Sequence, residues 1–119
     1  MSLKSGARLL AAALLLSTAW THSASAQTLE VAHNFPYGGH PYSTLIQASD
    51  GLFYGTTSMG GGADQGTVFR IDAAGNLQTL HEFYRVDGEA PSGALLEASD
   101  GFFYGTTSYG YPPYGGTVF

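Results

Sequence analysis

The stretch Pro41–Phe69, PYSTLIQASDGLFYGTTSMGGGADQGTVF, decides the fold because the chain repeats it. It returns fifty residues later as Pro91–Phe119, PSGALLEASDGFFYGTTSYGYPPYGGTVF, and 17 of the 29 aligned positions are identical. Chance matching at average composition would give about two identities. The chain therefore contains an internal duplication.

The duplication extends upstream, where His33-Asn34-Phe35 matches His81-Glu82-Phe83 after a two-residue length change. Repeat 1 then covers about residues 33–80 and repeat 2 about residues 81–119. Each His lies beside a Phe at the end of a predicted strand. The two histidines lie 48 residues apart on neighbouring units, so we expect packing or hydrogen bonding from them rather than one shared metal site.

Each repeat contains four short runs rich in β-branched and aromatic residues, separated by turn residues. No helical period is sustained after residue 27. We call the runs strands A, B, C and D, centred near Leu95, Tyr104, Val68 and Leu80. The predicted bounds are Ala94–Ala98 for A, Phe102–Ser108 for B, Gly66–Ile71 with its partial copy Gly116–Phe119 for C, and Leu77–Phe83 for D.

Two Asp-Gly pairs, Asp50-Gly51 and Asp100-Gly101, occupy the same place in the two repeats. They predict tight hairpin turns in which both central residues have positive φ. The aspartate side chain in such a turn accepts a hydrogen bond from the backbone two residues on. This turn role explains why the aspartates recur, without a metal-binding or acid–base function.

Four strands in a period of about fifty residues are typical of one blade of a β-propeller. We therefore predict an all-β fold in which residues 27–119 form a partial β-propeller of fewer than two four-stranded blades. A β-solenoid is the alternative, but its coils would be shorter and more uniform. Because a closed propeller needs about 4 to 8 blades, we expect this chain to be the N-terminal part of a protein that contains further repeats.

The motif Leu-x-x-Ala-Ser-Asp-Gly-x-Phe-Tyr-Gly-Thr-Thr is followed in both copies by a loop and then Gly-Thr-Val-Phe. This pattern resembles the GloVer tandem repeat of exported bacterial choice-of-anchor proteins, over residues 33–119. The resemblance implies a secreted or surface-anchored tandem-repeat protein with no established activity. Members of that family carry many copies and a C-terminal anchor segment, and neither is present in this sequence.

The first 26 residues have the layout of a cleavable signal peptide. A lysine and an arginine precede the apolar run LLAAALLL at 9–16, and Ala24-Ser25-Ala26 supplies the small-x-small cleavage pattern. The apolar run is shorter than the roughly 20 residues that span a bilayer. We predict a signal-peptide helix over residues 1–26, cleavage before Gln27, no membrane insertion afterwards, and a periplasmic, cell-surface or extracellular location.

The charge and composition exclude several classes of partner. The chain has 4 basic and 9 acidic residues, for a net charge of −5. Cleavage would remove two basic residues and no acidic one, leaving a net charge of −7, which does not suit nucleic acid or anionic lipid. There is no cysteine, hence no disulfide or thiolate metal site. No cofactor fingerprint, calcium loop or catalytic triad pattern is present, so we predict no cofactor, no metal and no catalytic residue.

Antiparallel strands place the B–C and D–A loops on one face of each repeat. The loops are Met59–Gln65 and Tyr109–Gly115 for B–C, and Pro36–His40 and Tyr84–Ala90 for D–A. They differ between the copies in length or sequence, and variable loops on a rigid scaffold are where binding usually occurs. This loop face is therefore the candidate binding surface.

Tyr109, Tyr111 and Tyr114 are the candidate ligand-binding residues. They lie on a loop stiffened by two prolines, and their flat apolar rings with hydroxyl tips suit a sugar ring or an extended peptide. The alternative is that they close the loop against a neighbouring blade. Asp64 and Asp87 also lie in loops of this face, but a glycosidase needs two carboxylates flanking one bond, and the sequence does not show that these two converge.

These observations predict a non-catalytic extracytoplasmic repeat scaffold that binds a glycan or protein through the B–C and D–A loops. The alternative is a fragment of a secreted carbohydrate-active enzyme whose catalytic residues lie in blades outside this sequence. Propellers serve both purposes, so the fold does not separate them.

Overall fold

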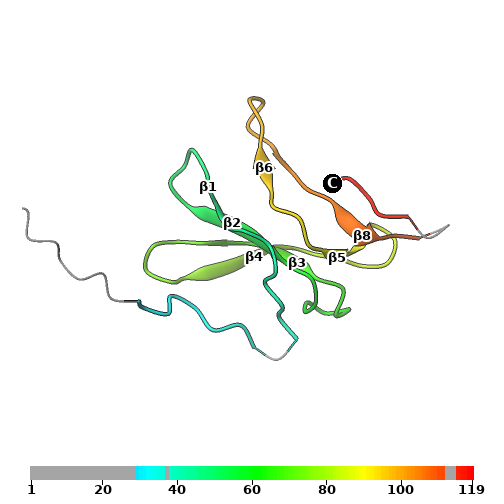
Figure 1. Cartoon of the computed structure of the whole chain (residues 1–119), viewed down its shortest axis with the longest axis horizontal. Coiled ribbons are helices and arrows are strands. Elements are labelled where there is room, and N and C mark those ends of the chain that lie inside the picture. The colour runs from blue at the N-terminus through cyan, green and yellow to red at the C-terminus, as the bar shows by residue number, and fades with distance from the viewer. Residues whose placement is uncertain (1–28, 37, 112–114) are drawn as a thin grey trace, which may run out of the picture. The chain divides into compact units, whose positions relative to one another are not determined.

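The computed structural model describes residues 29–36, 38–111 and 115–119. The chain divides into two compact units, Met1–Glu30 and Val31–Phe119. The predicted signal-peptide helix lies outside the described residues, and the second unit contains both repeats. The described residues are all-β, with no helix, and form three antiparallel sheets that do not close into a barrel (Figure 1).

Repeat 1 forms one four-stranded antiparallel sheet. Its strands are β1 (Ile46–Gln47), β2 (Phe53–Thr57), β3 (Thr67–Ile71) and β4 (Leu77–Glu82), hydrogen-bonded in the order β1-β2-β3-β4 (Figure 1). These are the predicted strands A to D, in chain order and antiparallel. A β-bulge interrupts the β3–β4 register between Val68 and Phe69. The sheet has four strands, the number predicted for one repeat.

Repeat 2 is divided into smaller sheets. Its strands are β5 (Glu89–Pro91), β6 (Leu96–Glu97), β7 (Phe103–Tyr104) and β8 (Thr107–Tyr109), and they form the pairs β5–β8 and β6–β7. The prediction of one continuous strand B over Phe102–Ser108 was wrong, because its two halves pair with different partners. The predicted strand Gly116–Phe119 is reduced to a bridge between Thr106 and Val118, with backbone hydrogen bonds between Gly105 and Phe119.

The second D–A segment also differs from the prediction. Tyr84–Ala90 was expected to be loop, but its end belongs to β5, which pairs with β8 through Glu89–Tyr109 and Pro91–Thr107. The Ala90 amide is hydrogen-bonded across to the Gln65 carbonyl of repeat 1 at 2.9 Å. Residues 85–87 still form a turn, so only the end of the segment, which contacts both repeats, belongs to a strand.

The Asp-Gly turns are one residue longer than predicted. Gly51 donates to the Ala48 carbonyl at 2.9 Å, and Gly101 donates to Ala98 at 3.0 Å. Gly51 and Gly101 have φ of 84° and 83°, whereas neither aspartate has a positive φ. Each hairpin is therefore a type I turn followed by a left-handed glycine. The prediction that both central residues have positive φ was wrong, because the turn begins at the alanine.

Side chains alternate between the two faces of the repeat 1 sheet. We call the face that carries Tyr54 and Val68 the front face, and the face that carries Gly55 and Phe69 the rear face. The register supports this division, since Gly55 is opposite Phe69 in the β2–β3 ladder. The equivalent positions, fifty residues later, define the front and rear faces of repeat 2.

The core lies between the two repeats. Ala48, Tyr54 and Val68 on the front face of repeat 1 cluster with Phe83 and Leu95 from repeat 2. The Tyr54 ring stacks on Phe103 with centroids 4.2 Å apart. At the edge of this interface, the Ser49 amide donates to Glu97 Oε2 at 2.9 Å and the Ser49 hydroxyl donates to Oε1 at 2.5 Å. Repeat 2 is thus stabilised by covering one face of repeat 1.

Candidate functional site

The B–C and D–A loops of repeat 1 lie side by side, as the strand order predicts. A Cβ added at Gly38 in the D–A loop would lie 3.3 Å from the Asp64 carboxylate in the B–C loop. In repeat 2 the D–A loop contacts the beginning of strand C, where Thr117 Oγ1 donates to the Asp87 carbonyl at 3.0 Å. The two loops therefore form one surface in repeat 1.

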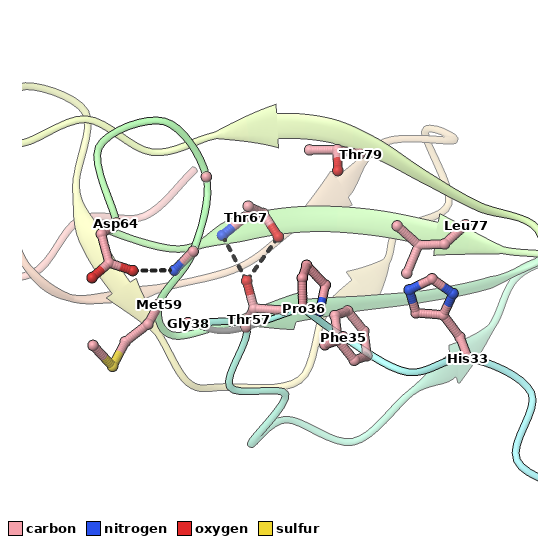
Figure 2. A pocket seen from close by; sticks show the side chains of 13 residues that line it. His33, Phe35, Pro36, Gly38, Thr57, Met59, Asp64, Thr67, Leu77 and Thr79 are labelled. Atoms are coloured by element: carbon pink, nitrogen blue, oxygen red, sulfur yellow. Dashed lines mark hydrogen bonds between the residues drawn. The ribbon is translucent and has the colours of Figure 1, made fainter.

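A cavity of about 710 Å³ opens on this face of repeat 1. Its apolar lining comes from Phe35 before the D–A loop, Met59 in the B–C loop, and Leu77 on β4 (Figure 2). Glycines from both loops form part of its wall. The size falls in the range of small-molecule sites, which are about 300–1,000 Å³.

Polar groups from several segments converge on the same cavity: His33, Thr57, Asp64, Thr67 and Thr79 (Figure 2). Asp64 accepts a hydrogen bond from the Gly60 amide at 2.8 Å through Oδ1. Its Oδ2 has no hydrogen-bond partner among the described residues. An exposed carboxylate oxygen beside an apolar wall can accept hydrogen bonds from the hydroxyls of a ligand.

Two buried threonines hold the B–C loop closed at its base. The hydroxyls of Thr57 and Thr67 are 2.8 Å apart, and the Thr67 amide donates to Thr57 Oγ1 at 3.1 Å. Thr107 and Thr117 repeat both contacts in repeat 2, at 2.8 Å and 2.9 Å. The sequence places these threonines in strands but does not reveal their pairing. The pair fixes the separation of strands B and C where the loop begins.

The predicted ligand-binding tyrosines belong to the repeat 2 copy of the loop face. Tyr109 ends β8, and both Tyr109 and Tyr111 have largely exposed side chains. Tyr114 lies outside the described residues. The cavity is formed instead at repeat 1, where the B–C loop has no aromatic residue. Sequence reasoning missed Phe35 and Leu77 there, because both are in or beside strand D rather than in a loop.

Asp64 and Asp87 have separate structural partners. Asp87 Oδ1 accepts from the Tyr84 amide at 2.8 Å, and Oδ2 lies 2.9 Å from His81 Nε2. Asp87 therefore closes its own loop and fixes the His81 ring, whereas Asp64 closes the loop in repeat 1. The His81–Asp87 contact was not predicted, because no local pattern indicates that the D–A loop turns back onto strand D.

The histidines pack against phenylalanines, as predicted. The His33 and Phe35 rings pack edge-to-face with their centroids 5.1 Å apart, and the His81 and Phe83 rings pack in the same way with centroids 4.8 Å apart. Each phenylalanine then packs on the Phe of a Gly-Thr-Val-Phe motif, Phe35 on Phe69 and Phe83 on Phe119. The repeated triad of rings is a packing unit of the repeat.

The turn aspartates are explained by local hydrogen bonds. Asp50 Oδ1 accepts from the Leu52 amide and Asp100 Oδ1 from the Phe102 amide, each at 2.9 Å, which confirms the predicted bond two residues on. The hydrogen bonds from the Tyr54 hydroxyl and the Leu52 amide hold the pKa of Asp50 below its ordinary value of 3.8. For Asp100, the Phe102 amide and then the Tyr104 hydroxyl lower the pKa in the same direction.

Two further observations concern the part of the chain that the structure describes. It brings no three metal-ligating side chains (His, Cys, Asp or Glu) together. It also contains no helix with the length and apolar character needed to cross a membrane.

Comparison with known families assigns the chain. The model of the Gloeobacter/Verrucomicrobia repeat matches residues 16–119, which include both repeats. Comparisons with curated proteins and with solved structures gave no match. The matched region contains the duplicated Ala-Ser-Asp-Gly turns, the paired threonines and the Gly-Thr-Val-Phe motifs described above. The chain belongs to the Gloeobacter/Verrucomicrobia repeat family.

Proposed function

We propose that this protein is a non-catalytic, exported repeat scaffold that binds a neutral glycan at the loop face of repeat 1. The observation that carries the proposal is the 710 Å³ cavity between the D–A and B–C loops. Membership of a repeat family agrees with a scaffold role. Export rests on the predicted signal peptide.

The chemistry of the cavity favours a sugar over an anionic ligand. Phe35 and Met59 offer an apolar wall for the C–H face of a sugar ring. Asp64 and Thr79 offer oxygen atoms for its hydroxyl groups. The mature net charge of −7 disfavours anionic ligands. Tyr109 and Tyr111 would extend the same surface to a second sugar unit on repeat 2, by ring stacking.

Isothermal titration calorimetry of the full chain with a panel of neutral oligosaccharides tests this proposal. We expect Met59→Ala to weaken binding about fivefold, the scale of one lost apolar contact of about 1 kcal/mol. Leu80→Ala is the matched control, since Leu80 is similarly exposed on β4 but does not line the cavity. Equal loss in the two variants would contradict the site.

Two other outcomes would change the proposed ligand or the proposed role. Binding of an uncharged peptide, with no response to any sugar, would overturn the glycan proposal in favour of a protein ligand. Release of shorter sugars during incubation would contradict the non-catalytic role.

A further inference from the structure

The front faces of the two repeats carry the same tyrosine and valine at equivalent positions but differ greatly in exposure. Tyr54 and Val68 are 5% and 9% exposed, because repeat 2 covers them. Their copies in repeat 2, Tyr104 and Val118, are 40% and 77% exposed. The covered surface of repeat 1 is thus present a second time, uncovered.

The rest of the repeat 2 front face is also apolar and exposed. Leu96 and Phe102 lie on it, and both are largely exposed. Their copies in repeat 1, Ile46 and Leu52, are partly buried against the core. A contiguous exposed apolar face of this kind marks an interaction surface.

The rear face shows the opposite relationship. In repeat 2 it carries Leu95, which is 4% exposed because it packs against repeat 1. Its copy in repeat 1, Leu45, is 48% exposed. Beside Leu45, an open groove of about 300 Å³ is lined mainly by apolar residues, among them Phe35 and Phe69. Each half of the repeat 1–repeat 2 interface therefore recurs, and no described residue of the chain covers the second occurrence.

We propose that the front face of repeat 2 binds the rear face of repeat 1 in a second copy of this chain. The contact between the two repeats within one chain supplies the geometry. Tyr104 would stack on Phe53 of the second copy, as Tyr54 stacks on Phe103. Ser99 would meet Gln47 of the second copy, as Ser49 meets Glu97, and the Gln47 side-chain oxygen can accept one of the two equivalent hydrogen bonds.

Because the front and rear faces are different surfaces, this association runs head to tail. A head-to-tail contact leaves one unused half at each end of the assembly, so it continues into a ring or an open chain of molecules. His33 and Phe35 line both the groove on the rear face and the cavity at the loop face, so the two sites adjoin. The association is argued from the contact between the repeats and is tested without any glycan, so its failure and the failure of the proposed glycan binding are distinguishable.

Light scattering coupled to size-exclusion chromatography of the full 119-residue chain tests the proposal. We expect a mass that exceeds the monomer and rises with concentration. Val118→Lys should block the front half and Leu45→Lys the rear half, so each variant alone should elute as a monomer. Val86→Lys is the control, since Val86 is 80% exposed and lies in the segment between β4 and β5, outside the strands that form the two faces.

Mixing the two blocked variants separates this proposal from unspecific aggregation. Val118→Lys retains an intact rear face and Leu45→Lys an intact front face, so an equimolar mixture should form a dimer and nothing larger. A mixture that stays monomeric, blocked variants that associate like the wild type, or a wild-type chain that is monomeric at all concentrations would each overturn the proposal. Circular dichroism verifies folding, and Leu45→Ser replaces Leu45→Lys if the lysine variant unfolds.

Discussion

The Tyr54 hydroxyl donates a hydrogen bond to Asp50 Oδ2 at 2.7 Å, and Tyr104 donates to Asp100 Oδ2 at 2.8 Å. Tyr54 is buried between the repeats, whereas Tyr104 is exposed. The same bond forms in both environments, so it belongs to the repeat itself and not to the interface. One aspartate thereby fixes the A–B turn through Oδ1 and anchors strand B through Oδ2.

Asp100→Ala should lower the melting temperature by a few degrees without changing glycan affinity. The substitution removes the acceptor for both the Phe102 amide and the Tyr104 hydroxyl. Calorimetry and ligand titration on the same sample measure the two quantities. Ser99→Ala in the same turn is the control, since no hydrogen bond of the Ser99 side chain is formed among the described residues. Unchanged stability with lost binding would show that Asp100 contacts the ligand.

Stability should fall at both ends of the pH scale. The folded-state pKa values of Asp50, Asp72 and Asp100 lie below the ordinary 3.8, so their stabilisation is complete above that value and is lost as pH falls through the lowered pKa. The Asp50 and Asp100 hydrogen bonds raise the pKa of Tyr54 and Tyr104 above 10.0. That contribution is complete below pH 10 and is lost as pH rises through the raised pKa.

Melting temperatures measured from pH 2 to pH 12 test this dependence. Tyr104→Phe removes one of the two tyrosine hydrogen bonds and should reduce the alkaline loss while retaining most of the acid loss. An alkaline limb that is identical in this variant and in the wild type would contradict the assignment.

The duplication allowed most of the local structure to be predicted from the sequence. Strands C and D of repeat 1 were placed within one residue, since β-branched runs bounded by glycine and aspartate leave little freedom. The division of strand B in repeat 2 could not be predicted, because it depends on which segments pair with its two halves. Pairing between distant segments is not encoded in local propensity.

The candidate site was predicted only as a face. Strand order alone places the B–C and D–A loops together, and the structure shows that they meet. The cavity itself depends on how Phe35 and Leu77 pack beside the loops, which are tertiary contacts with no local pattern. The aromatic loop of repeat 2 gave the stronger sequence signal, but the cavity formed in the repeat without it.

Val68→Ala should destabilise the fold far more than Val118→Ala. The two valines occupy equivalent positions, but Val68 is buried between the repeats and Val118 is exposed. We expect a loss of about 2 kcal/mol for Val68→Ala from removed apolar contact, and a change within about 0.5 kcal/mol for Val118→Ala. Urea unfolding of dilute protein measures both. Equal losses would mean that repeat 2 does not cover repeat 1 in solution.

The exported protein should begin at Gln27. The positively charged N-terminal region, the apolar run and the Ala-Ser-Ala pattern together predict cleavage by signal peptidase at the bond after Ala26. Intact-mass spectrometry of the chain recovered from the exported fraction of a bacterial host measures the N-terminus. Ala26→Arg is the control, since a bulky charge before the bond should block cleavage. A wild-type protein that retains Met1 in that fraction would contradict the predicted signal peptide.

Gly66→Ala should be far more damaging than Gly101→Ala. Both glycines have positive φ, of 106° and 83°, so each alanine pays a backbone strain of about 1–2 kcal/mol. A Cβ at Gly101 meets nothing within 4 Å, whereas a Cβ at Gly66 collides with the Thr57 carbonyl and the Pro91 ring. The Gly66 carbonyl also accepts a hydrogen bond from the Phe83 amide at 2.9 Å. Because Phe83 belongs to the core between the repeats, a displacement of Gly66 would disturb that interface. We expect Gly101→Ala to fold with a cooperative melt and Gly66→Ala to lose that melt. Similar melting of the two variants would show that strands B and C are not held as closely at the base of the loop as the structure has them.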